Sequence, residues 1–235
     1  MKPVCLLTGS GGRLGTALCR TLSAEYNVVA VYRQRIPCVS SQLVSQVDND
    51  ASWAAARESL SVFCVQADLT RREDLRRLVE VALAKFDVID AIVNAAADVN
   101  FHGKLLELWH DDEYAPLQMQ TNCIAPIELV SAVHQQCWKD QSNQNLTRNR
   151  CVINMSCLSG IRTYGTTGQG FSACSAAALN MLTFHLSLEL APYSVRANSV
   201  CMPKLRDQSS IKQAVEAVTK LLSGKDSGTI VSLMP

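Results

Sequence analysis

Four glycines near the start of the sequence have the spacing of a phosphate-binding turn. Gly9, Gly11, Gly12 and Gly15 lie in "TGSGGRLG", which follows an apolar run and precedes a helical pattern. Glycine permits the backbone angles of a tight turn and lets a phosphate approach the backbone closely, while the amino terminus of the following helix attracts the anion. The position between a first strand and a first helix therefore favours a nucleotide-binding turn over a simple tight turn.

Cysteines and histidines could carry redox, metal or nucleophilic chemistry, but their spacing does not indicate it. The ten cysteines are scattered, several of them inside apolar runs, and no CxxC pair occurs. The four histidines show no metal-ligand spacing. We therefore expect no metal site, and we interpret the cysteines as buried reduced thiols of a cytoplasmic protein.

The composition is that of an ordinary globular domain, with 48% hydrophobic and 18% charged residues in a chain of 235. The net charge of +1 gives no electrostatic reason to expect binding to nucleic acid or to an acidic membrane. No run of 18 apolar residues occurs, and the amino-terminal apolar run leads into the glycine turn. We therefore expect neither a membrane span nor a signal peptide.

Seven apolar runs of strand length alternate with segments of helical period. The expected strands lie at 4–9, 27–32, 61–68, 88–96, 150–156, 194–201 and 228–234. Near-continuous apolar strands that alternate with helices are typical of α/β proteins whose parallel sheet is covered on both faces. The spacing of Thr70 and Glu73 predicts a capping box at the start of one helix. We expect one domain over residues 1–235.

Six short motifs, in the same order and spacing, resemble those of the short-chain dehydrogenase/reductase family. They are "TGSGGRLG", "VQADLT", "IVNAAAD", "QTNCIAP", "VINMSCLSG" and "LSLELAPYSVRANSV". The resemblance implies a single Rossmann-type doubly wound parallel sheet of about seven strands. It also implies a nicotinamide cofactor. Arg13 stands where the family usually has the middle glycine, which resembles the NADPH-using, pteridine-reductase-like branch.

The resemblance also indicates which residues would bind the cofactor. Within the turn it points to phosphate contacts, at Asp68 to the adenine, and at "IVNAAAD" to the end of a central strand. The positions so implied are Gly9, Ser10, Gly11, Arg13, Leu14, Gly15, Arg33, Asp68, Leu69, Asn94, Ala95 and Ala96.

A preference for NADP(H) over NAD(H) has an argument of its own. Arg33 follows the second expected strand directly, at the family's 2′-phosphate position, and Arg13 could add a second contact. A guanidinium group suits bidentate phosphate binding. No acidic residue ends that strand to bind a free 2′-hydroxyl. The alternative is that Arg33 and Arg35 are only solvated loop charges.

The family's proton-transfer residues are substituted in this sequence. By resemblance, Cys157 stands at the serine, Phe171 at the tyrosine and Ser175 at the lysine, and only Asn122 matches the catalytic asparagine. Phenylalanine has no exchangeable proton, and serine has no charge with which to shift a neighbouring pKa. Positioned general acid–base catalysis contributes roughly 10²–10⁴-fold, so ordinary carbonyl reduction should be very poor.

Other residues could have taken over the chemistry. Tyr164 lies on the loop that usually lines the substrate pocket and could supply a phenol, but it is more simply a wall or surface residue. Cys157 could act as a nucleophile, although no histidine is placed to activate it. Ser156 should face away from the cofactor because strand side chains alternate. The connection at about 204–210 is shorter than in relatives, which would leave the nicotinamide end open.

The sequence therefore leaves several functional hypotheses. The first is a non-catalytic or weakly catalytic subunit, partner or sensor that binds NADP(H). The second is an NADPH-dependent reductase of altered mechanism, acting without an acid on an iminium-type or other biosynthetic small-molecule substrate. The third is a protein that binds no nucleotide. By resemblance, the helices that include 106–136 and 171–190 would pair in a homodimer or homotetramer.

Overall fold

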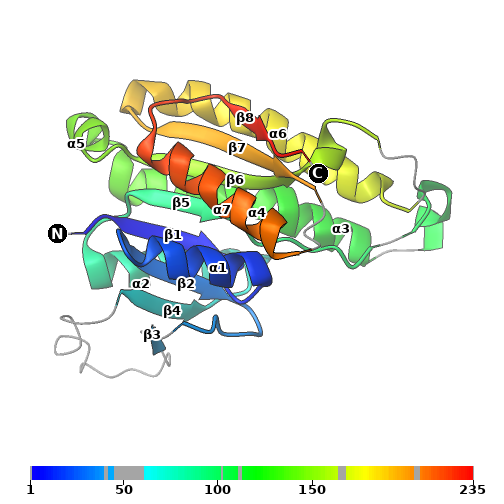
Figure 1. Cartoon of the computed structure of the whole chain (residues 1–235), viewed down its shortest axis with the longest axis horizontal. Helices are drawn as coiled ribbons and strands as arrows, with labels where there is room; N and C mark the ends of the chain where they lie inside the picture. The colour runs from blue at the N-terminus through cyan, green and yellow to red at the C-terminus, as the bar shows by residue number, and fades with distance from the viewer. Residues whose placement is uncertain are drawn as a thin grey trace.

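The architecture is a single parallel sheet between two layers of helices (Figure 1). The computed structural model describes residues 2–39, 42–44, 61–101, 103–110, 113–163, 168–203 and 207–234. Within these residues the sheet has eight strands in the order β3-β4-β2-β1-β5-β6-β7-β8, and every neighbouring pair is parallel. The strands are β1 (Val4–Thr8), β2 (Asn27–Tyr32), β3 (Gln42–Val44), β4 (Val62–Gln66), β5 (Ala91–Asn94), β6 (Cys151–Cys157), β7 (Arg196–Met202) and β8 (Ile230–Ser232).

All seven expected strands are confirmed, and β3 is an eighth that the sequence did not predict. This edge strand has only three residues, which is too short for an apolar pattern to stand out. The doubly wound parallel fold is therefore correct, with one more strand than the predicted number of about seven.

Seven α-helices flank the described part of the sheet. They are α1 (Arg13–Leu22), α2 (Arg72–Phe86), α3 (Tyr114–Met119), α4 (Ala125–Val133), α5 (Ser142–Thr147), α6 (Gly170–Leu190) and α7 (Gln208–Ser223). Short turns of 3₁₀-helix form η2 (Leu105–His110), η5 (Leu158–Gly160) and η6 (Ala191–Tyr193). Two π-helical turns, η3 (Gln120–Ile124) and η4 (His134–Trp138), continue α3 and α4.

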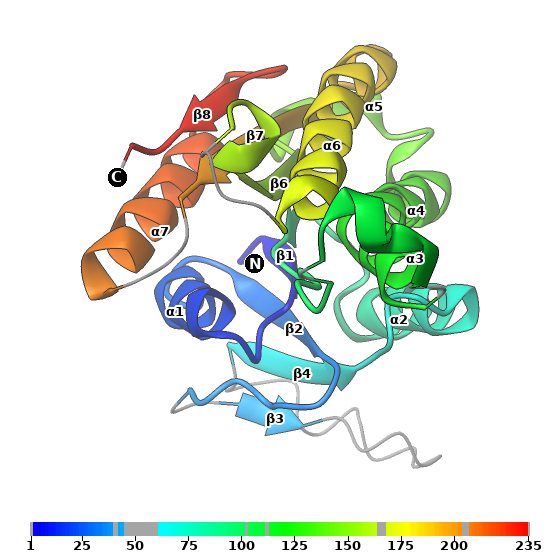
Figure 2. The same cartoon turned by 90° about the vertical axis from the view of Figure 1, so that its right-hand side faces the viewer.

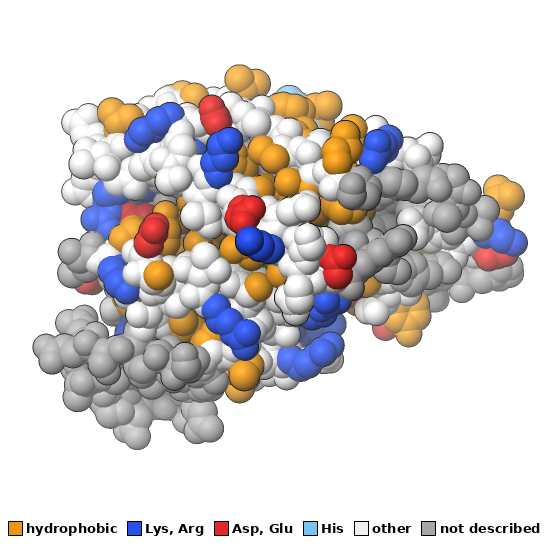
Figure 3. Space-filling view, viewed as in Figure 1, with side chains coloured by type: hydrophobic (Ala, Val, Ile, Leu, Met, Phe, Trp, Pro, Cys, Tyr) orange, Lys and Arg blue, Asp and Glu red, His pale blue; other side chains and the backbone are white. Residues whose placement is uncertain are grey.

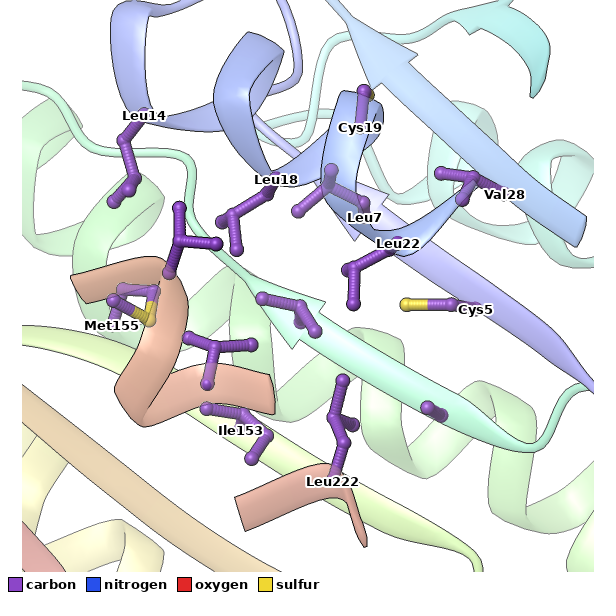
Figure 4. Packing of buried hydrophobic residues seen from close by; sticks show 14 of the residues in the cluster. Cys5, Leu7, Leu14, Leu18, Cys19, Leu22, Val28, Ile153, Met155 and Leu222 are labelled. Atoms are coloured by element: carbon purple, nitrogen blue, oxygen red, sulfur yellow. The ribbon is translucent and has the colours of Figure 1, made fainter. Parts of the chain in front are cut away.

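The helices cover both faces of the sheet, as Figure 2 shows. On one face α1 and α7 pack over Cys5 and Leu7 of β1, whereas on the other α2, α4 and α6 pack over Val4 and Leu6. Successive side chains of one strand thus enter two different cores, and both are fully buried. Figure 4 shows the first core, where Leu18 and Leu22 of α1 lie close to Leu7 of β1.

All ten cysteines are free thiols, and most of them belong to the interior. Six are buried: Cys5, Cys19, Cys64, Cys123, Cys151 and Cys201. Burial raises the pKa of the Cys19 thiol to about 12 and that of the Cys64 thiol to about 11. The interpretation of these cysteines as buried reduced thiols fits the packing.

The predicted capping box at Thr70 is wrong. Helix α2 begins at Arg72, and its N-cap residue Arg71 makes no side-chain capping bond. The Thr70 hydroxyl instead donates to Oδ1 of Asp68 at 2.7 Å. A threonine near a helix start can bind a neighbouring side chain as readily as the backbone, so the motif alone did not determine the cap.

A buried ionic cluster joins elements at the amino ends of the central strands. The Asp90 carboxylate, 2% exposed, accepts hydrogen bonds from the backbone N–H of Val4 at 2.8 Å and from Nη2 of Arg148 at 2.8 Å. Nε of Arg150, which is also buried, lies 3.4 Å from the same carboxylate. Arg150 donates in turn to the side chain of Asn145. The cluster therefore ties β1, the loop before β5, α5 and the start of β6 together.

The segment Gly170–Tyr193 is, by length and composition alone, long and apolar enough to cross a membrane. Most of this region is α6, and α6 has a polar side that faces the sheet. The Oδ1 atom of Asn180 accepts a bond from Ser199 of β7, and Thr183 accepts one from Asn154 of β6. We therefore interpret α6 as a core helix of the α/β fold.

Candidate functional site

A cavity of about 290 Å³ opens at the carboxyl ends of the central strands. Because β1 lies between β2 and β5, the strand order reverses there, and ligands of open α/β sheets bind at such a point. In Figure 1 the arrowheads mark the carboxyl ends of the strands, and the loops that surround the site leave the sheet on that side. The lining residues are Gly9, Gly11, Gly12, Val31, Tyr32, Arg33, Gln34, Arg35, Ala67, Asp68, Leu69, Thr70, Ala95, Ala96, Ala97, Asp98 and Thr121.

The glycine turn is packed so closely that two of its members have no room for a side chain. A methyl group on Gly11 would overlap the carbonyl oxygen of Arg35, and one on Gly15 would overlap that of Gly9. Gly9 itself has a φ of 69°, in the left-handed region that favours glycine. The turn and the loop after β2 thus form one continuous wall of the cavity.

Replacing Gly11 with alanine should lower the free energy of unfolding by about 1–3 kcal/mol, because the added methyl group must push the backbone at Arg35 away. Gly12→Ala is the matched control, since a methyl group there would meet its nearest neighbour, the carbonyl oxygen of Gly9, at 3.4 Å. Chemical denaturation of both variants measures the difference. Equal stability would contradict the packing described.

The amino terminus of α1 is suited to an anion. Its N-cap residue is Gly12, which has no side chain to bind the first-turn N–H groups, and no acidic residue lies in the first turn. The N–H groups of Ser10 and Gly12 are bonded to the carbonyls of Val31 and Gly9. Among the described residues, the N–H groups of Gly11 and of residues 13–15 at the start of the helix have no backbone partner, so they remain available to an anion. Arg13, the first residue of the helix, adds a positive charge where the helix dipole already favours an anion.

Several residues of the predicted cofactor site make hydrogen bonds that hold the turn and its neighbouring strands in place. Ser10 is fully buried, and its hydroxyl donates to the Val31 carbonyl at 2.8 Å. Thr8 Oγ1 accepts bonds from the N–H groups of Ala95 and Ala96 at 3.1 and 3.2 Å. Asn94 donates to Asn154 of β6 at 2.8 Å. These bonds fix the relative positions of β1, β2, β5 and β6.

Two more of the expected residues also serve packing. Leu14 belongs to the core between α1 and α7, and Gly15 allows the helix to approach the turn. Ala95 and Ala96 line the cavity, although their N–H groups are bound to Thr8. Five of the predicted positions do not line the cavity: Ser10, Arg13, Leu14, Gly15 and Asn94.

Asp68 and Leu69 lie at the end of the cavity between β2 and β4. Burial would raise the pKa of Asp68, but hydrogen bonds from Thr70 and the positive charges of Arg33 and Arg71 outweigh it and hold the pKa below its ordinary value. Asp68 is therefore a carboxylate at neutral pH and an acceptor for an amino group. Arg33 and Arg35, both after β2, supply the positive charge of this end.

Asn122 and Ser175 come together, as the resemblance implies. Asn122 lies in the π-helical turn η3, and such turns frequently occur at functional sites. Its amide accepts from the Asp98 N–H at 2.6 Å and donates to the Asp98 carbonyl at 2.8 Å. Its Nδ2 also lies 3.4 Å from the Ser175 hydroxyl, which donates to the Ser172 carbonyl. This amide is an orienting group with its bonding capacity largely used.

Phe171 and Cys157 stand on neighbouring elements beside this pair. Phe171, in the first turn of α6, packs edge-on against Phe101 with ring centroids 5.7 Å apart. Cys157 ends β6 and is half-buried. The Ser156 hydroxyl donates to the Ala176 carbonyl of α6 at 3.2 Å. Tyr164 and residues 204–206 lie outside the described residues. Helix α7 begins at Gln208, six positions after the end of β7 at Met202.

Several lining residues were not identified from the sequence as parts of the site, and three of them are Asp98, Thr121 and Arg35. Asp98 follows β5 and is 5% exposed, and Thr121 precedes Asn122 and is 8% exposed. Arg35 lines the cavity as well. Asp98 and Thr121 stand inside the motifs "IVNAAAD" and "QTNCIAP" but had no predicted role, and Arg35 was considered only as a solvated loop charge.

Comparison with known proteins identifies the family. The profile described as short chain dehydrogenase matches residues 3–214, so the chain belongs to the short-chain dehydrogenase family. The short-chain dehydrogenase anuF of Penicillium roqueforti is 26% identical over 86% of this chain and 73% of its own length. The dehydrogenase/reductase SDR family member 4 of Mus musculus is 25% identical over 98% of this chain and 80% of its own length.

Solved structures show the same fold. An oxidoreductase of this family from Brucella ovis, in complex with a partially ordered NAD, has a TM-score of 0.74 at 19% identity, with each chain covered completely. A short chain dehydrogenase from Leptospira borgpetersenii with bound NAD⁺ has a TM-score of 0.78 at 17% identity, over 99% of this chain and 91% of that one.

Proposed function

We propose that the protein binds NADP(H) in the cavity but transfers hydride poorly or not at all to ordinary carbonyl substrates. The observation that carries the proposal is the cavity at the strand-order reversal, bounded by the uncapped amino terminus of α1. The pyrophosphate would lie against the N–H groups of that helix. Asp68 and Leu69 would hold the adenine. The related structures with NAD support a nicotinamide cofactor in this fold.

The arginines after β2 support NADP(H) over NAD(H). Arg33 and Arg35 line the same end of the cavity as Asp68, and a 2′-phosphate is the anion that a guanidinium binds best there. A carboxylate at the end of β2 would instead favour a free 2′-hydroxyl, but that strand ends at Tyr32 and is followed by Arg33. Arg13 would contribute through the phosphates at the helix terminus.

The surroundings of Asn122 support weak catalysis. A bound nicotinamide would supply or accept a hydride, and the substrate oxygen would then need a proton donor or acceptor. Phe171 has none to offer, and the Ser175 hydroxyl is 1% exposed and bonded to the Ser172 carbonyl. The protein would then act as a non-catalytic or weakly catalytic subunit, partner or sensor in the cytoplasm.

The aromatic pair Phe101 and Phe171 favours one alternative. These rings place an apolar, edge-to-face wall where the acid would stand. A cationic acceptor such as an iminium needs no proton to accept hydride, and aromatic faces attract cations. The alternative function is therefore an NADPH-dependent reductase of altered, acid-independent mechanism.

An exposed apolar stripe supports the proposal of a homodimer or homotetramer. Met181, Phe184 and Leu188 lie three and four residues apart on α6, with 57%, 39% and 71% of each residue exposed. An isologous pairing of such a stripe would cover it. Elsewhere, over α1 and α7, acidic and basic side chains are interspersed with apolar ones (Figure 3).

Calorimetric titration with NADPH, NADP⁺ and NADH tests the proposal. We expect micromolar binding of at least one NADP form, and Arg33→Ala should weaken it by about 10- to 100-fold, the equivalent of a lost hydrogen bond to a charged group. NADH affinity should not change in that variant, because NADH has no 2′-phosphate. Arg13→Ala tests the helix-terminal contact in the same way.

Arg76→Ala is the matched control, since it removes the same charge from the exposed face of α2. It should leave all three affinities unchanged. Absence of binding by every nucleotide would refute the proposal and would leave the glycine turn as a relic of the fold.

A further inference from the structure

Asp98, the last residue of the "IVNAAAD" motif, is a buried carboxylate for which the motif predicted no role. It lines the cavity, and 5% of the residue is exposed. Its oxygens accept two hydrogen bonds, from the N–H of Asn100 at 2.8 Å and from its side-chain amide at 3.1 Å. Both donors are neutral, so the structure gives this carboxylate no cationic partner among the described residues.

The position of Asp98 within the cavity is determined by the fold. Arg33, Arg35 and Asp68 follow β2 and β4, whereas Asp98 follows β5 on the other side of β1. If the adenosine lies at the β2–β4 end and the pyrophosphate at α1, an extended dinucleotide must place its nicotinamide on the β5 side. Asn122 binds both backbone groups of Asp98 and connects it to Ser175 on α6.

Among the described residues, no cation pairs with the Asp98 carboxylate. Thr121, Asn122 and Ser175 are neutral. Lys104, the next charged residue after Asp98 in the sequence, pairs with Glu107 at 3.4 Å on an exposed turn. The Thr121 hydroxyl, also buried at the cavity wall, has no hydrogen-bond partner among the described residues. This end of the cavity is thus negatively charged and holds a polar group that a ligand could satisfy.

We infer that Asp98 makes the cavity select the oxidised form of the nicotinamide cofactor over the reduced form. The inference rests on the proposed function. The oxidised ring carries a positive charge and the reduced ring is neutral, whereas the remainder of the two molecules is the same. A nearby carboxylate therefore stabilises one form specifically. At an effective dielectric constant of about 20 and a separation of roughly 7–12 Å, the attraction amounts to about ten- to fifty-fold in affinity.

This selectivity gives the proposed sensor a direction. A protein with this site would be occupied mainly when the cofactor pool is oxidised, and it would release the cofactor as the pool becomes reduced. The occupied state would also be a poor hydride donor, in agreement with the missing proton relay.

The test is a pair of dissociation constants for the wild-type protein. NADPH binding is followed by its own fluorescence, and NADP⁺ binding by calorimetry and by displacement of NADPH. We expect NADP⁺ to bind about ten- to fifty-fold more tightly. NAD⁺ should show a similar ratio over NADH, because the difference lies in the nicotinamide ring alone.

The variant Asp98→Asn keeps the shape of the side chain and removes its charge. It should bring the ratio close to one, whereas Glu216→Gln, which removes a charge from the exposed face of α7, should keep it. Ser175→Lys should lower or reverse the ratio by adding a cation beside Asn122. The wild-type ratios decide the question even if a variant does not fold.

The outcomes separate this inference from the proposed function. If both oxidised and reduced forms bind equally, or the reduced form binds more tightly, the inference is wrong and the proposed cofactor site stands. If the preference persists in a folded Asp98→Asn protein, Asp98 is not its source, and the inference is again wrong. If no nucleotide binds, both are wrong.

Discussion

Replacing Phe171 with tyrosine and Ser175 with lysine in one chain should raise the rate of carbonyl reduction by about 10²–10⁴-fold. The tyrosine would supply the proton that Phe171 cannot, and the lysine would lower the pKa of the phenol. Asn122 already lies 3.4 Å from Ser175, so it could orient the new lysine. The rate is measured as NADPH oxidation with an aromatic aldehyde, a 1,2-diketone and a β-keto ester.

The single variants are the controls for this gain. Phe171→Tyr alone keeps the ring against Phe101 and should give only a small increase, because its phenol lacks a cation to tune it. Ser175→Lys alone adds charge without an acid. The double variant must remain folded and bind NADPH, since the Ser175 site is buried and a lysine there needs space. A folded, cofactor-binding double variant without any gain would show that more than the relay is missing. The loss of some activity of the wild-type protein would instead support a repurposed pocket.

Replacing Asp90 with alanine should lower the free energy of unfolding by about 3–5 kcal/mol. The substitution leaves Arg150, which is 1% exposed, without its carboxylate, and it removes the acceptor for the Val4 N–H. Arg148 would lose its partner as well. Urea denaturation followed by circular dichroism measures the change.

An exposed carboxylate provides the comparison for the Asp90 variant. Glu216 pairs with Lys212 at 3.8 Å on the surface of α7, and Glu216→Ala should cost well under 1 kcal/mol. Since Asp90 lies at the opposite ends of the strands from the cavity, Asp90→Ala should bind NADP(H) normally wherever it is folded. A loss of stability no larger than that of the surface variant would contradict the role given to the cluster.

The strands and the glycine turn could be predicted because their signals are local. Each long apolar run became a strand, those in the middle of the sheet are buried on both faces, and "TGSGGRLG" became the turn at the start of α1. The edge strand β3 could not be predicted because three residues carry no period. The start of α2 was misplaced because Thr70 had a side-chain partner, Asp68, that the capping motif does not consider.

The cofactor-binding positions were harder to predict from the sequence than the fold was. Motif positions cannot separate a residue that lines a cavity from one that supports it, so Ser10, Leu14 and Asn94 were grouped with Asp68 and Arg33. Their burial depends on contacts with β2, α7 and β6, which are distant in the sequence. Asp98 was not predicted because its place in the cavity depends on a contact between distant parts of the sequence. The loop after β5 meets η3, where the Asp98 N–H donates to the Asn122 side chain.

The buried cysteines allow opening of the fold to be measured by alkylation, without an added label. Only a thiolate reacts with alkylating reagents. In the folded protein six cysteine sulfurs are shielded from the reagent, and burial raises the pKa of their thiols, which keeps them protonated. Cys38 and Cys174 are exposed, so they would be modified without any opening. A mass increase beyond these two labels would then measure the fraction of molecules that have passed through an open state. The six buried sulfurs lie on β1, β4, β6, β7 and two helices, so partial labelling would show which part of the sheet opens first.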